Sequence, residues 1–200
     1  MDLIFKKIGT TNEIQREIYE KFVDLVQAQI CGLGPGGTWQ GVETMTWLMT
    51  TPLDYVAVDT LACHLTLQLN YLEKTKGQTL LFWQPQDILV VGLSTNSSTD
   101  SQTRPMYLLA NLTQLVPLSP QAPEQLVLTY PATYPFPAAY CAPELLALTE
   151  LPFRTHKSAS YYSLALLCLH MLNLSLAELK GTKLFYFLER CLKERVLLYL

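Results

Sequence analysis

The stretch from Tyr140 to Leu174 reads YCAPELLALTELPFRTHKSASYYSLALLCLHMLNL, and it decides the fold. Pro143 suits the first position of a helix, because the N–H that proline lacks has no partner there. The leucines that follow offer an apolar face to that helix: Leu145, Leu146 and Leu148. After a polar and basic gap, residues 163–174 are almost wholly apolar. This run is too short to cross a bilayer, so we predict a buried central helix there.

Composition limits the classes of protein to consider. The chain has 200 residues, of which 50% are hydrophobic, enough for one domain or a tightly coupled pair with a substantial core. The formal net charge of −3 and the lack of a basic block argue against nucleic acid or an anionic membrane as the main partner. Neither a signal peptide nor a transit peptide is visible at the amino terminus, so we expect a cytoplasmic or other reducing compartment.

The cysteines and histidines predict no metal site. Five cysteines make an odd number without C-x-x-C spacing, so we expect reduced, mostly buried thiols rather than disulfides or zinc ligands. They are Cys31, Cys63, Cys141, Cys168 and Cys191. His64 falls inside a helical pattern and is interpreted as a core or boundary residue, and neither His156 nor His170 shows ligand spacing to it.

Hydrophobic spacing outlines the rest of the chain. Residues 3–8 suggest a short strand and residues 12–30 an amphipathic helix that ends in a glycine-rich turn. A strand is predicted around residues 45–49. A second helix is predicted over residues 53–74, where five apolar side chains share a face: Val56, Leu61, Leu65, Leu69 and Leu72.

Two apolar runs, DILVVGL and MYLLANL, flank a polar loop at residues 94–105 and predict a hairpin. Six prolines are spread through residues 114–141, so we expect a stiff, extended cover there. The aromatic residues of that segment are expected to pack inward rather than form a contact surface: Tyr130, Tyr134, Phe136 and Tyr140. These patterns by themselves predict a mainly helical α+β domain.

The order of Ala142-Pro143-Glu144, a short helix, a polar loop and a buried helix resembles the carboxyl lobe of the eukaryotic protein kinases. The resemblance implies a kinase-like carboxyl lobe over residues 51–200 and a reduced amino lobe over residues 1–50. It also implies that Glu144 pairs with an arginine of the closing helix. We expect that arginine to be Arg195, with Arg190 as the second candidate.

The same resemblance places the residues of kinase catalysis, and most of them are replaced. Residues 80–91, LLFWQPQDILVV, align with the kinase pattern H-R-D-L-K-P-E-N-I-L-L. Phe82 then stands where the catalytic aspartate accepts a proton, and Asp87 replaces the metal-binding asparagine, although it alone could still hold a cation. Asn111 replaces the aspartate of D-F-G. Ser160 replaces the aspartate that anchors the backbone of the catalytic loop in kinases. We expect the serine to anchor that backbone only weakly.

In the amino lobe, Lys6 and Glu17 would occupy the positions of the kinase ion pair that holds ATP phosphates. The alternative is that they are two solvated surface charges. No G-x-G-x-x-G hairpin precedes Lys6, so we expect no cofactor, and nucleotide binding is not favoured.

The expected function is therefore that of a catalytically inactive kinase-like domain, a structural or interaction subunit whose partners are other proteins. The alternative is a residual nucleotide-binding or rewired phosphotransferase domain that uses Lys6, Glu17 and Asp87. A regulatory pseudokinase that competes with an active kinase is a third possibility, which the sequence does not separate from the first.

Overall fold

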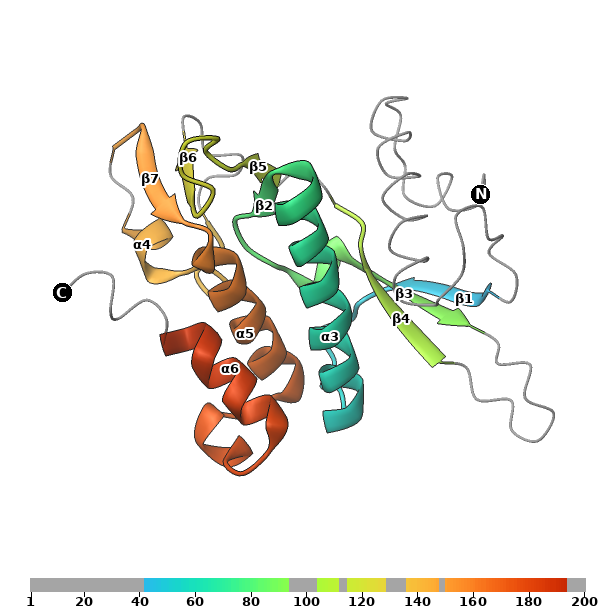
Figure 1. The fold of residues 1–200 in the computed structure, drawn as a ribbon. Helices are drawn as coiled ribbons and strands as arrows, with labels where there is room; N and C mark the ends of the chain where they lie inside the picture. Colours follow the sequence, from blue (N-terminus) through green and yellow to red (C-terminus); the bar gives the residue numbers. More distant parts are fainter. Residues whose placement is uncertain (1–41, 94–103, 112–114, 129–135, 148–149, 194–200) are drawn as a thin grey trace. The chain divides into compact units, whose positions relative to one another are not determined.

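A computed structural model describes residues 42–93, 104–111, 115–128, 136–147 and 150–193 (Figure 1). The chain divides into two compact units, Met1–Val42 and Glu43–Leu200, whereas the sequence placed the boundary after residue 50. Lys6, Glu17, the strand predicted at residues 3–8 and the helix predicted at residues 12–30 lie outside the described residues.

A three-stranded sheet has the order β1–β3–β4. β1 (Val42–Trp47) covers most of the strand predicted around residues 45–49. β3 (Ile88–Leu93) and β4 (Arg104–Leu109) pair antiparallel, with Ile88 opposite Leu109. This pairing confirms the predicted hairpin. The prediction succeeds because both runs are apolar enough to form strands that are buried on two faces.

α3 (Tyr55–Tyr71) is capped by Asp54, whose carboxylate accepts a hydrogen bond from the backbone N–H of Ala57 over 2.8 Å. The prediction that Val56 shares a face with the four leucines of its predicted helix face is wrong: those leucines are buried, whereas Val56 is 72% exposed and Val58 is fully buried instead. Side chains two positions apart on a helix point in nearly opposite directions. The helix face that contains Val58 therefore excludes Val56. A π-helical turn, Leu72–Lys76, ends the helix, and Gly77 follows with φ at +61°.

Side chains of α3 complete the hydrogen bonding of β4, the edge strand of the sheet. The Gln68 side chain is 1% exposed; its Nε2 donates to the carbonyl of Tyr107 over 2.8 Å, and its Oε1 accepts from the N–H of Leu109 over 2.9 Å. His64 Nδ1 accepts from the N–H of Tyr107 over 3.3 Å. His64 is thus a boundary residue, as predicted, and burial lowers its pKa. These bonds hold α3 against the sheet and satisfy an edge that would otherwise lie open.

Two small sheets lie beyond the helix. β2 (Gln78–Leu80) pairs with β5 (Leu115–Pro117), and β6 (Gln125–Leu128) pairs with β7 (Phe153–His156), both antiparallel. β7 falls in the stretch that the sequence predicted as a polar loop. The four residues of β7 mix apolar, polar and charged side chains, so they give no strand signal of their own. Their hydrogen-bond partners lie in β6, 25 or more residues away in the chain.

The stretch that decides the fold contains two helices. α4 (Pro143–Leu146) begins at Pro143, as predicted, but it has a single turn, and Leu146 is 45% exposed. α5 (Ser158–Leu172) is the predicted buried helix, although it begins five residues before residue 163 and leaves Leu174 outside. Small residues that hydrogen-bond inside the core extend it toward the amino end. α6 (Lys183–Lys193) packs on α5, and α5 packs on α3 (Figure 1).

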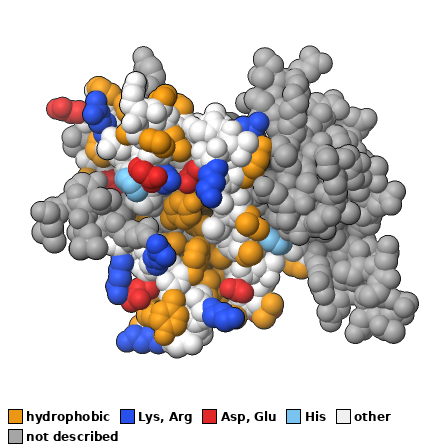
Figure 2. All heavy atoms as spheres, in the orientation of Figure 1, with side chains coloured by type: hydrophobic (Ala, Val, Ile, Leu, Met, Phe, Trp, Pro, Cys, Tyr) orange, Lys and Arg blue, Asp and Glu red, His pale blue; other side chains and the backbone are white. Residues whose placement is uncertain are grey.

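The fold class is α+β, with more residues in helices than in strands among those that the structure describes. Phe136 and Tyr140 are buried, so the expectation of inward packing holds for both, and the other two tyrosines lie outside the described residues. Among the described residues, no helix is both long and apolar enough to span a bilayer. Acidic and basic side chains lie interspersed with apolar ones on the face shown in Figure 2.

Candidate functional site

The segment that follows β2 is part of the core. Phe82 is 1% exposed and Trp83 is fully buried. The Phe82 ring meets the Phe136 ring edge to face, with 6.0 Å between centroids. Phe82 also belongs to an apolar cluster that draws on β6, α4 and α5, with Leu126, Leu128, Leu145 and Ala159 among its members. At the position that the resemblance assigns to the catalytic base, the structure therefore has a core aromatic ring.

Two serines of α5 hold the backbone of this segment. The hydroxyl of Ser160 donates to the carbonyl of Leu80 and lies 2.8 Å from the hydroxyl of Thr79. Ser163 Oγ accepts from the N–H of Trp83 over 2.7 Å, and the indole N–H of Trp83 donates to the carbonyl of Ser160 over 3.1 Å. Both serines are fully buried. A serine thus makes direct contact with the backbone at the position where the resemblance expects an anchor.

Asp87 and Asn111, which the resemblance assigns to the metal site, lie side by side. Asn111 Nδ2 donates to Asp87 Oδ1 over 2.7 Å, and the backbone carbonyl of Asp87 accepts from the N–H of Ala110 over 2.8 Å. Asp87 is 3% exposed, and its Oδ2 has no hydrogen-bond partner. Burial raises the pKa of this carboxyl, against the opposing effects of Asn111 and the Gln84 backbone. No group of three or more potential metal ligands occurs among the described residues.

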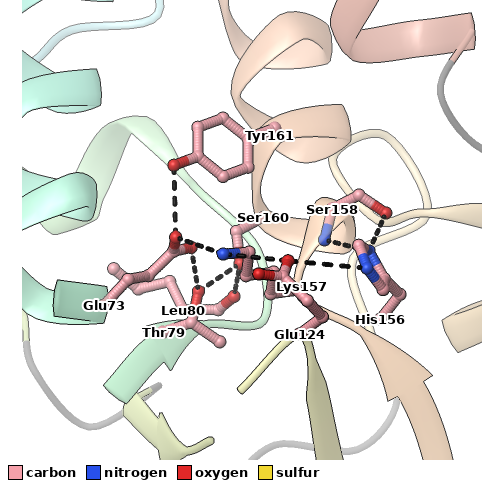
Figure 3. A network of polar contacts seen from close by, with 9 residues as sticks. All are labelled: Glu73, Thr79, Leu80, Glu124, His156, Lys157, Ser158, Ser160 and Tyr161. Atoms are coloured by element: carbon pink, nitrogen blue, oxygen red, sulfur yellow. Dashed lines mark hydrogen bonds and ion pairs between the residues drawn. The ribbon is translucent and has the colours of Figure 1, made fainter. Parts of the chain in front are cut away.

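A second polar network joins the end of α3 to the start of α5 (Figure 3). Glu73, whose side chain is 6% exposed, accepts from the hydroxyls of Thr79 over 3.1 Å and Tyr161 over 3.3 Å. Its carboxylate lies 3.6 Å from Lys157 Nζ. Burial raises the pKa of Glu73 although these three partners lower it, and burial followed by the Glu73 charge raises the pKa of Tyr161. The sequence analysis did not identify Glu73, since a glutamate near a helix end carries no distinctive signal.

The outer half of this network is a cap rather than a catalytic centre. Lys157 Nζ also lies 2.9 Å from Glu124, and His156 Nε2 lies 3.7 Å from the same carboxylate. His156 Nδ1 contacts the hydroxyl of Ser158 over 2.9 Å and accepts the Ser158 backbone N–H over 3.1 Å. A serine, histidine and glutamate in line suggest a hydrolase triad. Ser158 is only 4% exposed, however, and His156 Nδ1 is engaged by the first N–H of α5, so the arrangement serves the helix start.

The Ala142-Pro143-Glu144 motif lies at the edge of the core, with Pro143 exposed and Glu144 half-buried. Ala142 is fully buried at the N-cap of α4, and Pro143 begins the helix. Glu144 Oε1 accepts from the hydroxyl of Thr155 over 3.2 Å, which ties α4 to β7. Arg195, the expected partner of Glu144, lies outside the described residues, and Arg190 lies in α6.

The described cysteines are free thiols. Cys141, Cys168 and Cys191 are buried, as predicted, and burial raises the pKa of Cys141 to about 12. Cys63 is exposed on α3, and Cys31 lies outside the described residues.

Comparison of the chain with protein-family models, with curated proteins and with solved structures finds no match.

Proposed function

We propose that this chain is a catalytically inactive, protein-kinase-like domain that acts as a structural or protein-interaction subunit of a larger assembly. The observation that carries the proposal is the burial of Phe82 against Phe136 in the core. Kinase catalysis requires a carboxylate at this position to accept the proton of the substrate hydroxyl. A phenyl ring has no group that accepts a proton, and a core position has no room for substrate.

The Asp87–Asn111 contact supports the same proposal. In a kinase, the residues at these two positions hold magnesium. Here the carboxamide of Asn111 donates to Asp87, so each partly satisfies the other inside the protein. Ser160 and Ser163 supply the anchoring bonds that keep the loop in place without catalysis. These contacts within the protein hold the loop in place, and none of them involves a nucleotide.

The native mass of the full chain tests this proposal. An affinity-tagged copy is isolated from its source under mild conditions, its mass is measured, and its companions are identified by mass spectrometry. We expect a stoichiometric complex with other proteins. A free monomer of 22.6 kDa with no companions would overturn the proposal.

The second candidate function is a residual nucleotide-binding or rewired phosphotransferase domain. The observation that favours it is the partnerless Oδ2 of Asp87, a buried carboxylate oxygen next to Asn111. A ligand that binds only the folded state raises the melting temperature. Millimolar ATP with Mg²⁺ should then stabilise the wild-type chain but not Asp87→Asn, whereas no shift in either protein would eliminate this function.

A further inference from the structure

The register of the β6–β7 pair decides which backbone groups of β7 point outward. The N–H of Lys157 donates to the carbonyl of Glu124 over 2.9 Å, and Gln125 lies opposite His156. In an antiparallel pair, hydrogen-bonded and non-hydrogen-bonded positions alternate. Phe153 and Thr155 therefore bond to β6. The N–H and C=O groups of Arg154 and His156 point to the other side.

β6 is covered on both edges, whereas within the described part of the chain no backbone pairs with the outer edge of β7. The carbonyl of Gln125 accepts from the N–H of Ser119, and Leu118 forms an antiparallel bridge with Leu126, so the chain after β5 covers the far edge of β6. β7 is thus the outermost strand of this group, as Figure 1 shows. Among the described residues, none hydrogen-bonds to the backbone of Arg154 or His156. This contrasts with β4, where Gln68 and His64 occupy the edge.

The charged side chain along the outer edge of β7 is that of Arg154. Arg154 is exposed, and no described residue pairs with its guanidinium. Its cross-strand neighbour on the same face is Val127, which is 36% exposed. Only Arg154 and His156 offer outward groups, so pairing two copies of β7 would place Arg154 opposite Arg154 or His156. Neither complements a guanidinium, and like charges directly opposite destabilise a strand pair.

We propose that the outer edge of β7 binds an extended segment of another protein by strand addition, with an acidic side chain of that segment opposite Arg154. The inference rests on the proposed interaction function and names the kind of partner that it requires. Backbone hydrogen bonds to Arg154 and His156 supply the attachment, and the carboxylate supplies the selectivity. Pro152, just before the strand, has no N–H, so the added strand pairs only along Phe153–His156.

A peptide titration tests the inference. The probe is a fluorescein-labelled peptide of about ten residues that alternates threonine and valine around one central aspartate. The matched probe has lysine in place of that aspartate. Fluorescence anisotropy with the full chain should show binding of the aspartate probe and weaker binding of the lysine probe.

Two variants locate the binding on β7. Arg154→Pro removes an outward N–H without touching the bonds to β6, and it should abolish binding of both probes. Arg154→Glu should weaken the aspartate probe by at least about tenfold and favour the lysine probe. Lys180→Glu makes the same charge change at another exposed position and should leave both affinities unchanged. Circular dichroism checks that each variant is folded. If Arg154→Pro does not fold, the affinities of Arg154→Glu for the two probes test the inference.

The inference is overturned if the wild-type chain does not bind the aspartate probe at millimolar concentration. It is also overturned if Arg154→Glu binds both probes as the wild type does. Such a failure, alongside a stoichiometric native complex, would leave the proposed interaction function standing and eliminate only this edge. A free monomer would instead count against the proposed function itself, whatever the peptide does.

Discussion

Asn111 Nδ2 donates to Asp87 Oδ1 over 2.7 Å, although the two residues are 24 positions apart in the chain. The β3–β4 hairpin brings them together, because Asp87 directly precedes β3 and Asn111 follows the end of β4. The other carboxylate oxygen of Asp87 stays buried without a hydrogen bond. The contact therefore relieves only part of the cost of burying this charge.

Removing the Asp87 charge should stabilise the fold. Burial raises the pKa of Asp87 in the folded state, so the folded state binds the proton more tightly than the unfolded state. Stability is then lost as pH rises from the ordinary carboxyl value through the raised folded value. We expect Asp87→Asn to be more stable at pH 7 by about 1–2 kcal/mol, with the difference vanishing in acid.

Urea denaturation across pH measures this difference. Asp59→Asn, at an exposed position of α3, is the matched control and should change little. A loss of stability in Asp87→Asn at pH 7 would contradict the prediction and indicate that the carboxylate has a cationic partner.

Placing an acid at position 82, which the kinase resemblance assigns to a catalytic base, should destabilise the fold. Phe82→Asp puts a carboxyl into the apolar cluster around Phe136 and leaves the volume of a phenyl ring unfilled. We expect a loss of at least about 3–5 kcal/mol in the free energy of unfolding, against about 1 kcal/mol for Phe82→Leu. Thermal and urea unfolding compare the two variants, and a stable, folded Phe82→Asp protein would contradict the burial that carries the proposed function.

Removing the hydroxyl of Ser160 or Ser163 in α5 should lower the free energy of unfolding measurably. Ser163→Ala leaves the buried N–H of Trp83 without its acceptor, which should cost about 1–3 kcal/mol. Ser160→Ala, which frees the Leu80 carbonyl, should cost a similar amount. Thr60→Ala removes an exposed hydroxyl that bonds within α3 and should lie within about 0.5 kcal/mol of the wild type. Equal effects in all three proteins would show that the serines are not anchors.

Acid should weaken the attachment of α3 to β4. Burial lowers the pKa of His64, so the folded state favours the neutral imidazole, whose Nδ1 accepts from Tyr107. Stability is then lost as pH falls from about 6.5, the ordinary histidine value, toward the lowered folded value.

The slope of stability against pH in the wild type and in His64→Leu tests this effect. The variant should be less stable near neutral pH and should lack the loss between about pH 7 and 5. His170→Asn, at an exposed histidine, should keep that loss. The same slope in the wild type and His64→Leu would contradict the prediction.

Several elements could be predicted from the sequence because their signals are local. Pro143 begins α4, and the two apolar runs on either side of residues 94–103 form the β3–β4 pair. The apolar run after residue 163 lies in the buried helix α5. Each depends on the backbone chemistry or the apolar continuity of one short segment, which no distant contact needs to supply.

Tertiary structure alone decided the rest. β7 is a strand only because β6 pairs with it, and Val56 faces outward because the packing of α3 selects the face of Val58. Glu73, Lys157 and Glu124 become a network only when α3, β6 and α5 converge (Figure 3). The sequence by itself determined the α+β pattern and placed a phenylalanine, Phe82, and an asparagine, Asn111, where the resemblance to kinases leads us to expect acids. Folding then buried that phenylalanine and joined that asparagine to Asp87, because burial and side-chain pairing depend on residues far apart in the chain.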